Sequence, residues 1–466
     1  MTTEARPSID LPTEVLREMA ADHLWRHFTP MSLDATVPLK VMVEGQGCYL
    51  VDSDGHRYLD GLSALFCVNI GYSYGTEVGQ AVAEQYERLP YANTWGTTYP
   101  NAILLASKVA SLAPANLNHV YFTPSGGEAV EAAWKLARQY HRTRGENRWK
   151  MISRDVAYHG TTLGAMALLG INEMRTGFEP VTPGGVRVRN TNPHAFPTAT
   201  SDDDVTQALL DDLEQRILQE DPSTVAGFII EPVQVHGGCL VPPPGYAEGV
   251  RRICDKYGIL LICDETITAW GRLGEWFAST RYGLEPDIIT TAKGITSGYG
   301  VLGCLIASDE IYQTLFAHEG AFLHGMTYGG HPASTTAALK NIEILEREGL
   351  LDHVRHNESA LATALASLLD LDVVADVRGA GYLWTVELAT TRRDGTALTV
   401  AELTDLYGNS KLTFPLQRAG LLIRYTIEAG DPALSIAPPL VAGPDEFHEI
   451  VRALRTVLTP LGADLP

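Results

Sequence analysis

Short apolar runs, separated by helical segments, constrain the fold of this chain more than any other feature of its sequence. The runs are apolar almost throughout and occupy residues 225–230, 259–263, 287–291 and 301–307. Strands buried on both faces have this composition, which is typical of mainly parallel sheets. A helical pattern at residues 128–141 follows a short strand-like run at residues 120–122, and a second at residues 244–257 lies between two of the runs. The alternation predicts a doubly wound α/β domain, with ligands beyond the carboxyl ends of its strands.

The two ends of the chain have a different character. Residues 11–28 have the pattern of an amphipathic helix, and residues 47–60 predict a β-hairpin around the turn Asp54-Gly55. A long helix is expected at residues 332–347, followed by strands of a second lobe and a closing helix at residues 377–388, 421–425 and 446–458. We therefore expect residues 1–74 and 334–466 to form a small α+β domain together, and residues 75–333 to form the large α/β domain.

Composition narrows the class of function. The 466 residues carry a formal net charge of −21, which argues against nucleic acid and anionic membranes as partners. No apolar run reaches the length of a membrane span, and the polar start of the chain has no signal-peptide pattern. Six cysteines without a CxxC pair indicate free thiols in a reducing cytoplasm. The histidines show no metal-ligand spacing, so no metal site is expected.

A lysine and a carboxylate end two of the apolar runs. Lys293 follows the run at residues 287–291 and is itself followed by small residues and glycines. A lysine held at a strand end is a candidate to lose its proton and act as a nucleophilic amine. Asp264 ends the run before it; a fixed anion there would keep a pyridine nitrogen protonated and make the ring a better electron sink. Taken alone, Asp264 is more often a helix cap or a surface carboxylate.

Two glycine-containing turns also follow predicted strands. Ser125, Gly126 and Gly127 join a strand to a helix, where free backbone N–H groups and the helix N-terminus attract an anion. The ordinary alternative is an N-capping turn with Ser125 as the cap. Tyr158, beside His159, is placed where its ring can stack on a planar cofactor, or else pack in the core.

Two polar segments complete the set. Glu231 follows a buried strand directly, and Gln234 just after it either donates to a phenolic oxygen or belongs to a polar loop. Residues 324–332 are rich in small and polar side chains, and their hydroxyls, Thr327 among them, suit a phosphate group. The alternative is a loop and N-cap with Pro332 in the first helical turn. The combined set supplies what is needed to hold pyridoxal 5′-phosphate (PLP) as a Schiff base of a lysine.

With these motifs the chain resembles the class III aminotransferases of PLP fold type I, also called ω-transaminases or amine:pyruvate transaminases. The resemblance covers nearly the whole chain. It rests on the order and spacing of residues 60–72, 123–128, 158–160, 231–234, 264–265, 271–274, 292–294, 324–332 and 437–440. It implies a large domain with a mainly parallel sheet and a small α+β domain built from both chain ends.

The resemblance also implies roles for the cofactor-binding residues. Lys293 would form the Schiff base with PLP and later carry protons, Asp264 would pair with the pyridine nitrogen, and Tyr158 would stack on the ring. The phosphate would be bound by Ser125, Gly126 and Gly127. The remaining residues that the resemblance places at the cofactor are His159, Glu231, Gln234, near the phenolic oxygen, and Thr266.

Substrate and subunit contacts are implied in the same way. Thr327 would reach the phosphate across a dimer interface, so the active site would need a homodimer. Phe66, Trp95 and Tyr158 would line the substrate pockets. Arg424 looks like the mobile arginine that binds a substrate carboxylate and swings away for an uncharged amine.

Three departures from the family pattern bear on the pocket. Gly127 stands where the family usually has serine, which removes a hydroxyl from the phosphate loop, and Thr266 stands where valine is usual. The stretch from Arg424 to Pro438 is a few residues longer than in the family. No core catalytic residue is lost, and the changes indicate a substrate pocket unlike that of the best-known members.

The predicted activity is transfer of an amino group from a primary amine, an ω-amino acid or a diamine to a keto acid such as pyruvate. Two half-reactions at one site predict ping-pong kinetics. The alternatives are a decarboxylase, racemase or aminomutase on the same fold, and a non-catalytic protein on an old scaffold. A nicotinamide-dependent dehydrogenase would need a glycine fingerprint that the chain lacks. The aromatic residues favour a hydrophobic amine, and the sequence does not name it.

Overall fold

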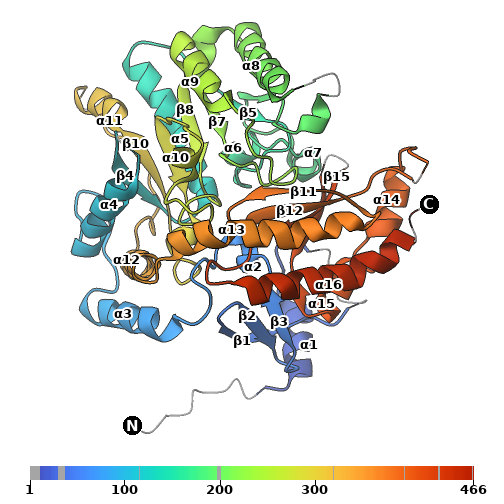
Figure 1. Cartoon of the computed structure of the whole chain (residues 1–466). Helices are drawn as coiled ribbons and strands as arrows, with labels where there is room; N and C mark the ends of the chain where they lie inside the picture. The colour runs from blue at the N-terminus through green and yellow to red at the C-terminus, as the bar shows by residue number, and fades with distance from the viewer. Residues whose placement is uncertain are drawn as a thin grey trace.

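A seven-stranded sheet forms the centre of the larger lobe (Figure 1). The computed structural model describes residues 11–29, 37–114, 116–196, 201–318, 320–392, 394–428, 431–463 and 465. In sheet order the strands are β4 (Leu117–Thr123), β10 (Gly303–Ser308), β9 (Ile288–Thr291), β8 (Leu260–Asp264), β7 (Val225–Ile230), β5 (Lys150–Arg154) and β6 (Gly185–Val188). The predicted mainly parallel sheet is confirmed: β10 alone among these seven strands runs opposite to the other six.

The apolar runs are buried on both faces of this sheet, as expected. Every residue of β7, β8, β9 and β10 is buried. Ile229 and Ile262 pack against α5 (Gly126–Thr143), whereas Phe228 and Leu261 pack in the cluster that includes α8 (Asp202–Gln219) and α9 (Tyr246–Tyr257). Helices therefore cover both faces, which is why these strands contain so few polar residues.

The second lobe contains two four-stranded sheets. One is β1-β2-β3-β13, and its strands are Met42–Gln46, Tyr49–Asp52, Arg57–Asp60 and Leu421–Leu422. The other is β11-β12-β15-β14, and its strands are Val374–Ala380, Leu383–Leu388, Asp431–Ile436 and Arg424–Glu428. Because β13 pairs parallel with β3, segments from both ends of the chain share one sheet. Figure 1 shows the blue N-terminal strands beside the red C-terminal helix α16 (Pro444–Ala463).

These sheets confirm the predicted fold class, with a large α/β part and a smaller α+β part built from both ends. The boundaries at residues 74 and 333 remain predictions. The remaining helices are α1 (Thr13–His23), α2 (Ser63–Phe66), α3 (Gly75–Arg88), α4 (Pro100–Leu112), α6 (Leu163–Met166), α7 (Asn172–Arg175), α10 (Ala278–Arg281), α11 (Asp309–Phe316), α12 (Pro332–Arg347), α13 (Leu350–Ala366), α14 (Val400–Tyr407) and α15 (Thr413–Arg418). No helix in the described part of the chain combines the length and apolarity that crossing a bilayer needs.

The first helix is shorter than the sequence pattern predicted. The pattern covers residues 11–28, whereas α1 begins at Thr13, after Pro12, and ends at His23. None of its residues is buried, so no packing surface extends it toward Phe28. Residues 1–10, where the polar start of the chain lies, are outside the described residues.

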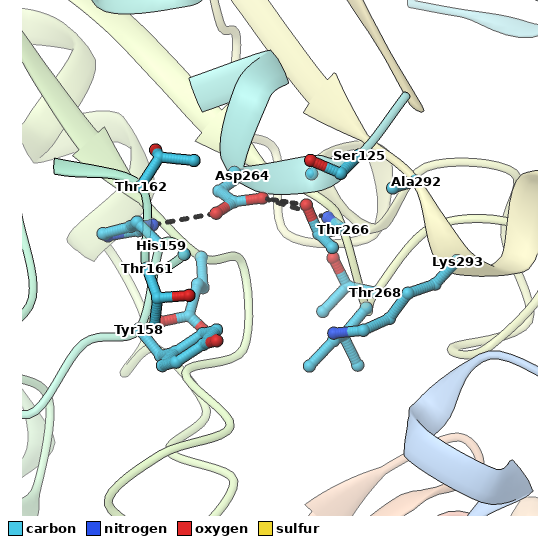
Figure 2. Close-up of a pocket in the computed structure, with 15 residues that line it drawn as sticks. Ser125, Tyr158, His159, Thr161, Thr162, Asp264, Thr266, Thr268, Ala292 and Lys293 are labelled. Atoms are coloured by element: carbon cyan, nitrogen blue, oxygen red, sulfur yellow. Dashed lines mark hydrogen bonds and ion pairs between the residues drawn. The ribbon is translucent and has the colours of Figure 1, made fainter. Parts of the chain in front are cut away.

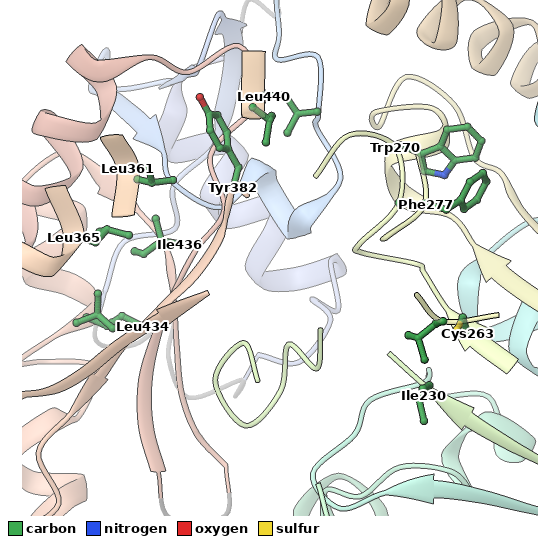
Figure 3. Close-up of a cluster of buried hydrophobic side chains, with 14 of the residues drawn as sticks. Ile230, Cys263, Trp270, Phe277, Leu361, Leu365, Tyr382, Leu434, Ile436 and Leu440 are labelled. Atoms are coloured by element: carbon green, nitrogen blue, oxygen red, sulfur yellow. The ribbon is translucent and has the colours of Figure 1, made fainter. Parts of the chain in front are cut away.

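One hydrophobic core runs through both lobes. It includes Ile230 and Cys263 at the large sheet, and Leu361, Leu434 and Ile436 beside the sheet of β11, β12, β15 and β14 (Figure 3). Burial of this shared surface stabilises the two lobes as one body. A cavity lies at the edge of the large sheet that is formed by the carboxyl ends of its parallel strands.

Candidate active site

Four neighbouring strands deliver polar side chains to one cavity of about 280 Å³. Tyr158 follows β5, Glu231 follows β7, Asp264 ends β8 and Lys293 follows β9. The cavity is lined by Ser125, Gly126, Gly127, Tyr158, His159, Gly160, Thr161, Thr162, Glu231, Asp264, Thr266, Ile267, Thr268, Ala292 and Lys293. It therefore lies beyond the carboxyl ends of the parallel strands, where the sequence predicted a ligand site.

Lys293 projects its amine into the cavity from a strained turn (Figure 2). It opens the short helix Lys293–Ile295 with a φ of 44°, which a non-glycine residue rarely adopts. Its Nζ lies 5.8 Å from the centre of the Phe66 ring. Burial lowers the pKa of Lys293 to about 8, against the attraction of Asp264, and the charge of Arg424 adds to the lowering. A large fraction of this amine is therefore neutral, and so nucleophilic, at mildly alkaline pH.

Asp264 is buried and held as a carboxylate by several donors. Its Oδ2 lies 2.8 Å from Nδ1 of His159, and its Oδ1 accepts from Thr266 Oγ1 at 2.6 Å and from Thr290 Oγ1 at 3.2 Å. Burial alone would raise the pKa of Asp264, but the hydrogen bonds from His159 and Thr266 outweigh it, and the pKa is lowered. Asp264 is therefore a fixed anion at the inner end of the cavity.

Two polar atoms behind Asp264 have no hydrogen-bond partner among the described residues. They are Nε2 of His159 and Oε1 of Glu231, and both are buried. Burial raises the pKa of Glu231 to about 7, and nearby His159 and Arg154 oppose the rise. Near neutral pH, Asp264 is therefore charged, whereas Glu231 is partly protonated. Hydrogen bonds stabilise the charged form of Asp264, whereas burial disfavours the charged form of Glu231.

The N-terminus of α5 forms the wall of the cavity near Ser125. The Ser125 side chain caps the helix by accepting from Glu128 N at 3.3 Å, so the N-cap expected from the sequence is present. A Cβ on Gly126 would lie 2.9 Å from the Thr266 side chain, whereas one on Gly127 would meet only ordinary contacts, the nearest at 3.6 Å. Thr162, which lines the same wall, has a buried Oγ1 that finds no partner within the described part of the chain. Free N–H groups and a spare hydroxyl suit an anion such as a phosphate.

A histidine that the sequence analysis missed lies beside Tyr158. The ring of His236 stacks on the Tyr158 ring, with centres 4.9 Å apart and 14° between planes, and its Nε2 lies 3.3 Å from Nη1 of Arg424. Arg424, predicted as a substrate-binding residue, is therefore next to a cavity-lining ring. The signal for His236 was its place two residues after Gln234, in a turn with two glycines; Thr161, Thr162 and Thr268 carried no comparable signal.

Four other predicted residues are not among those that line the cavity, and the first of them, Phe66, lies beside Lys293. Gln234 is buried, and its side-chain amide donates to the carbonyl of Asp155 at 2.8 Å. Thr327 is exposed, and its carbonyl accepts from the hydroxyl of Tyr91 at 2.7 Å. Trp95 is 68% exposed and lines a different surface hollow. The roles predicted for these residues stay predictions.

The residues that line the cavity match the chemical groups of PLP one by one. The cavity is close to the lower end of the range of roughly 300–1,000 Å³ for small-molecule sites. Lys293 offers an amine for an aldehyde, Asp264 an anion for a pyridinium, and Ser125 with the start of α5 a site for phosphate. The half-buried Tyr158 ring supplies a flat apolar face for the cofactor ring. The buried Oγ1 of Thr162, which has no partner among the described residues, would find an acceptor in such a phosphate.

Comparison with known proteins agrees with this geometry. The family model described as aminotransferase class-III matches residues 31–458. A probable aminotransferase of Mycobacterium tuberculosis is 44% identical over 456 residues, 98% of this chain and 97% of that protein. A putrescine–pyruvate aminotransferase of Pseudomonas aeruginosa is 34% identical over 97% of each chain.

Solved structures of transaminases have the same fold as this chain. An (S)-enantioselective ω-transaminase from Thermomicrobium roseum superposes with a TM-score of 0.91 at 35% identity. The match covers 96% of this chain and 98% of the other. The similarity is therefore not confined to the cavity but extends over both lobes.

Proposed function

The chain belongs to the class III aminotransferases, which transfer amino groups with PLP as cofactor, and on this premise we propose that Lys293 and Asp264 carry the reaction. The observation that supports this most is their placement at one cavity with Tyr158 and the start of α5. A nucleophilic amine, a buried anion, a flat ring and an anion site are the four groups that PLP needs.

Each side chain has a physical task in this proposal. When bound, PLP supplies a ring that accepts the electron pair left when a substrate C–H bond breaks. Lys293 takes up that proton at Nζ and delivers it again, which a pKa of about 8 allows. Asp264 would offer a negative charge to the ring nitrogen, since its pKa is lowered. Phe66, buried beside Nζ, excludes water from the lysine.

The test of these roles separates cofactor binding from turnover. We expect Lys293→Ala to retain PLP non-covalently and to lose amino transfer. Asp264→Asn is expected to keep the fold and PLP while losing roughly 10²–10³-fold in kcat, because one preorganised charge is removed. Lys293→Ala protein with wild-type turnover would contradict the assignment.

The proposed substrates are a primary amine and a keto acid such as pyruvate. Two features support this pair: a relative that acts on putrescine and pyruvate, and Arg424 beside Tyr158, where a guanidinium can bind a carboxylate. A panel of aromatic amines, diamines and ω-amino acids, each mixed with the PLP-loaded enzyme, would rank donors by the rate at which the cofactor absorbance changes. Loss of carbon dioxide from a donor, without amination of pyruvate, would indicate a decarboxylase instead.

The proposal includes a homodimer in which Thr327 serves the cavity of the partner subunit. Thr327 does not line the cavity of its own subunit, yet Tyr91 holds its backbone in place. Large apolar side chains are exposed nearby, with Leu323 86% and Trp95 68% exposed, which suits a surface covered by a second copy.

A subunit-mixing experiment tests this arrangement. Lys293→Ala subunits lack the amine, and Thr327→Asp subunits would repel the phosphate of their partner. Mixed dimers should regain activity because one of their two cavities has both native residues. A monomer in sedimentation experiments, or mixtures without any recovery, would rule the shared site out.

We place the enzyme in the cytoplasm. The six cysteines are free, and five of them are buried, as thiols in a reducing compartment usually are. Fractionation of source cells would check this, and activity in the extracellular fraction would contradict it.

A further inference from the structure

His236 stands at the tip of a rigid turn. Backbone hydrogen bonds between Gln234 and Leu240, 3.1 Å and 2.8 Å long, close the turn, and Gly238 N donates to Val235 O at 3.1 Å. Gly237 and Gly238 have φ values of 86° and 96°, which glycine adopts without strain. The backbone that carries His236 is therefore fixed before any substrate arrives.

Arg378 forms hydrogen bonds to the backbone of the turn that carries His236. Its Nε donates to the carbonyl of Gly238 at 2.6 Å and its Nη2 to that of Gly237 at 3.2 Å. The same guanidinium pairs with Asp376 at 2.8 Å and with buried Glu387. Since Arg378 belongs to β11, the turn from the large sheet is tied to the second lobe, and His236 has little freedom to move.

The hydrogen bond between His236 and Arg424 has a defined direction. A guanidinium only donates, so Nε2 of His236 accepts and the ring proton lies on Nδ1. His236 is buried, with 5% of its surface exposed, and Tyr158 covers one face of its ring. A neutral imidazole therefore holds a charged arginine directly beside the ring that lines the cavity.

From this geometry we infer that His236 sets the preference of the enzyme for carboxylate-bearing substrates by holding Arg424 at the cavity as its hydrogen-bond acceptor. The inference rests on the proposed function and extends it to substrate choice. His236 is a positioning residue, since it acts through Arg424.

The charge of the group that accepts the hydrogen bond from Arg424 affects how Arg424 binds a substrate carboxylate. A carboxylate partner would neutralise the guanidinium and compete with the substrate for it. The neutral imidazole of His236 adds no negative charge of its own beside the guanidinium. At 3.3 Å the bond is also long, so Arg424 can leave when an uncharged amine binds.

Protonation of His236 should release Arg424. An imidazolium has no lone pair to offer and carries the same charge as the guanidinium, so the contact becomes repulsive. Titratable and charged groups around the pair include Tyr158 and Lys293, on whose pKa values Arg424 has a lowering effect, the carboxyls of Glu231 and Asp264 near Lys293, and the guanidinium of Arg378 on the His236 turn. The KM for pyruvate should therefore rise at acidic pH, where His236 takes up a proton.

The experiment compares His236→Ala, His236→Gln and Arg424→Ala in PLP-loaded enzyme. Each is assayed with L-alanine and pyruvate, which carry a carboxylate, and with 1-phenylethylamine, which has none. We expect His236→Ala to raise the KM for alanine and pyruvate roughly five- to tenfold, the worth of one hydrogen bond, and to leave 1-phenylethylamine unchanged. His236→Gln, which keeps a neutral acceptor, should match the wild type at pH 8 and lose the rise in KM at pH 6.

A double variant provides the control. If His236 acts through Arg424, adding His236→Ala to Arg424→Ala should change the KM for alanine no further. Equal effects of His236→Ala on alanine and 1-phenylethylamine, or an unaltered pH profile in His236→Gln, would overturn the inference. Wild-type enzyme that transfers no amino group from any donor would instead overturn the proposed function.

Discussion

At the scale of single residues, the site separates the charge states of its ionisable groups by environment. Asp264 and Glu231 are both buried carboxyls, yet hydrogen bonds lower the pKa of the first and burial raises that of the second to about 7. Lys293 moves in the opposite direction, to about 8, because burial disfavours its charged form. Groups whose pKa values are pushed apart are suited to divided acid, base and electrostatic roles.

The first prediction concerns Lys293 in the apoenzyme. Only the neutral amine attacks the aldehyde of PLP, so the rate of PLP incorporation should rise with pH, with its midpoint at a pH of about 8. Stopped-flow absorbance after mixing apoenzyme with PLP would measure it. A midpoint near 10.5, the ordinary value for lysine, would show that the amine is not perturbed.

The second prediction concerns Glu231. Its pKa is about 7 when folded against an ordinary value of 4.5, so the folded protein holds the extra proton and stability falls as the pH rises from 4.5 through 7. Glu231→Gln does not titrate, so its apoenzyme should gain up to about 3 kcal/mol over the wild type between pH 5 and pH 8.5. Urea unfolding of both proteins at the two pH values measures the difference. A difference that does not change with pH would contradict the raised pKa.

Some site residues could be predicted from sequence and others could not. Lys293 and Asp264 carried a local signal, because each ends an apolar strand. His236 carried only a weak local signal, its place in a glycine turn just after Gln234, because its importance comes from Tyr158 and Arg424, which are distant in sequence and meet it only in the folded chain. Local sequence does not reveal a role for Thr327 either, because the role predicted for it needs a second subunit.

At the scale of elements, the start of α5 determines how the phosphate would be held. Gly126 and Gly127 are adjacent but not equivalent, because a Cβ is blocked at the first by Thr266 and accommodated at the second. The family serine that Gly127 replaces would therefore fit here. The absent hydroxyl is consistent with Thr162, which lines the same wall, supplying one in its place.

The third prediction uses these two glycines as a matched pair. Gly126→Ala should weaken PLP binding by roughly 1–3 kcal/mol, because the added methyl group overpacks the wall against Thr266. Gly127→Ala should bind PLP nearly as the wild type does, and Gly127→Ser should bind it at least as tightly. Fluorescence titration of each apoenzyme with PLP gives the dissociation constants. Equal losses in both alanine variants would show that the difference in space between the two positions has no effect on binding.

Strand positions could be predicted from the sequence to within a few residues, because burial on both faces leaves a continuous apolar run. The direction of β10 could not. The connection from Thr291 to Gly303 is too short for a crossover helix, so the chain returns antiparallel. The end of α1 was missed for the opposite reason: an amphipathic pattern continues past His23, but nothing packs against it.

At the scale of the whole molecule, one buried arginine joins the lobes. Arg272 donates to Ser63 Oγ at 2.9 Å, to Asn69 Oδ1 at 2.7 Å and to the carbonyls of Tyr382 and Pro438. These acceptors come from both ends of the chain, while Arg272 lies in the loop after β8. Burial lowers its pKa to about 10.

The fourth prediction follows from this contact. Arg272→Met should destabilise the apoenzyme by roughly 3 kcal/mol or more, because several buried acceptors lose a charged donor together. Arg272→Lys should recover only part of the loss, since an ammonium cannot span the same acceptors. Urea unfolding measures both, and an unchanged midpoint in Arg272→Met would show that the lobes are held together without it.

The central claim is that this cavity moves an amino group from an amine to a keto acid by way of Lys293. The most direct measurement supplies a donor amine carrying isotopically labelled nitrogen, together with pyruvate and PLP, and analyses the alanine by mass spectrometry. The account predicts labelled alanine and an equal amount of deaminated donor with the wild type, and neither with Lys293→Ala. Unlabelled alanine, or labelled alanine formed at the wild-type rate by Lys293→Ala, would contradict it.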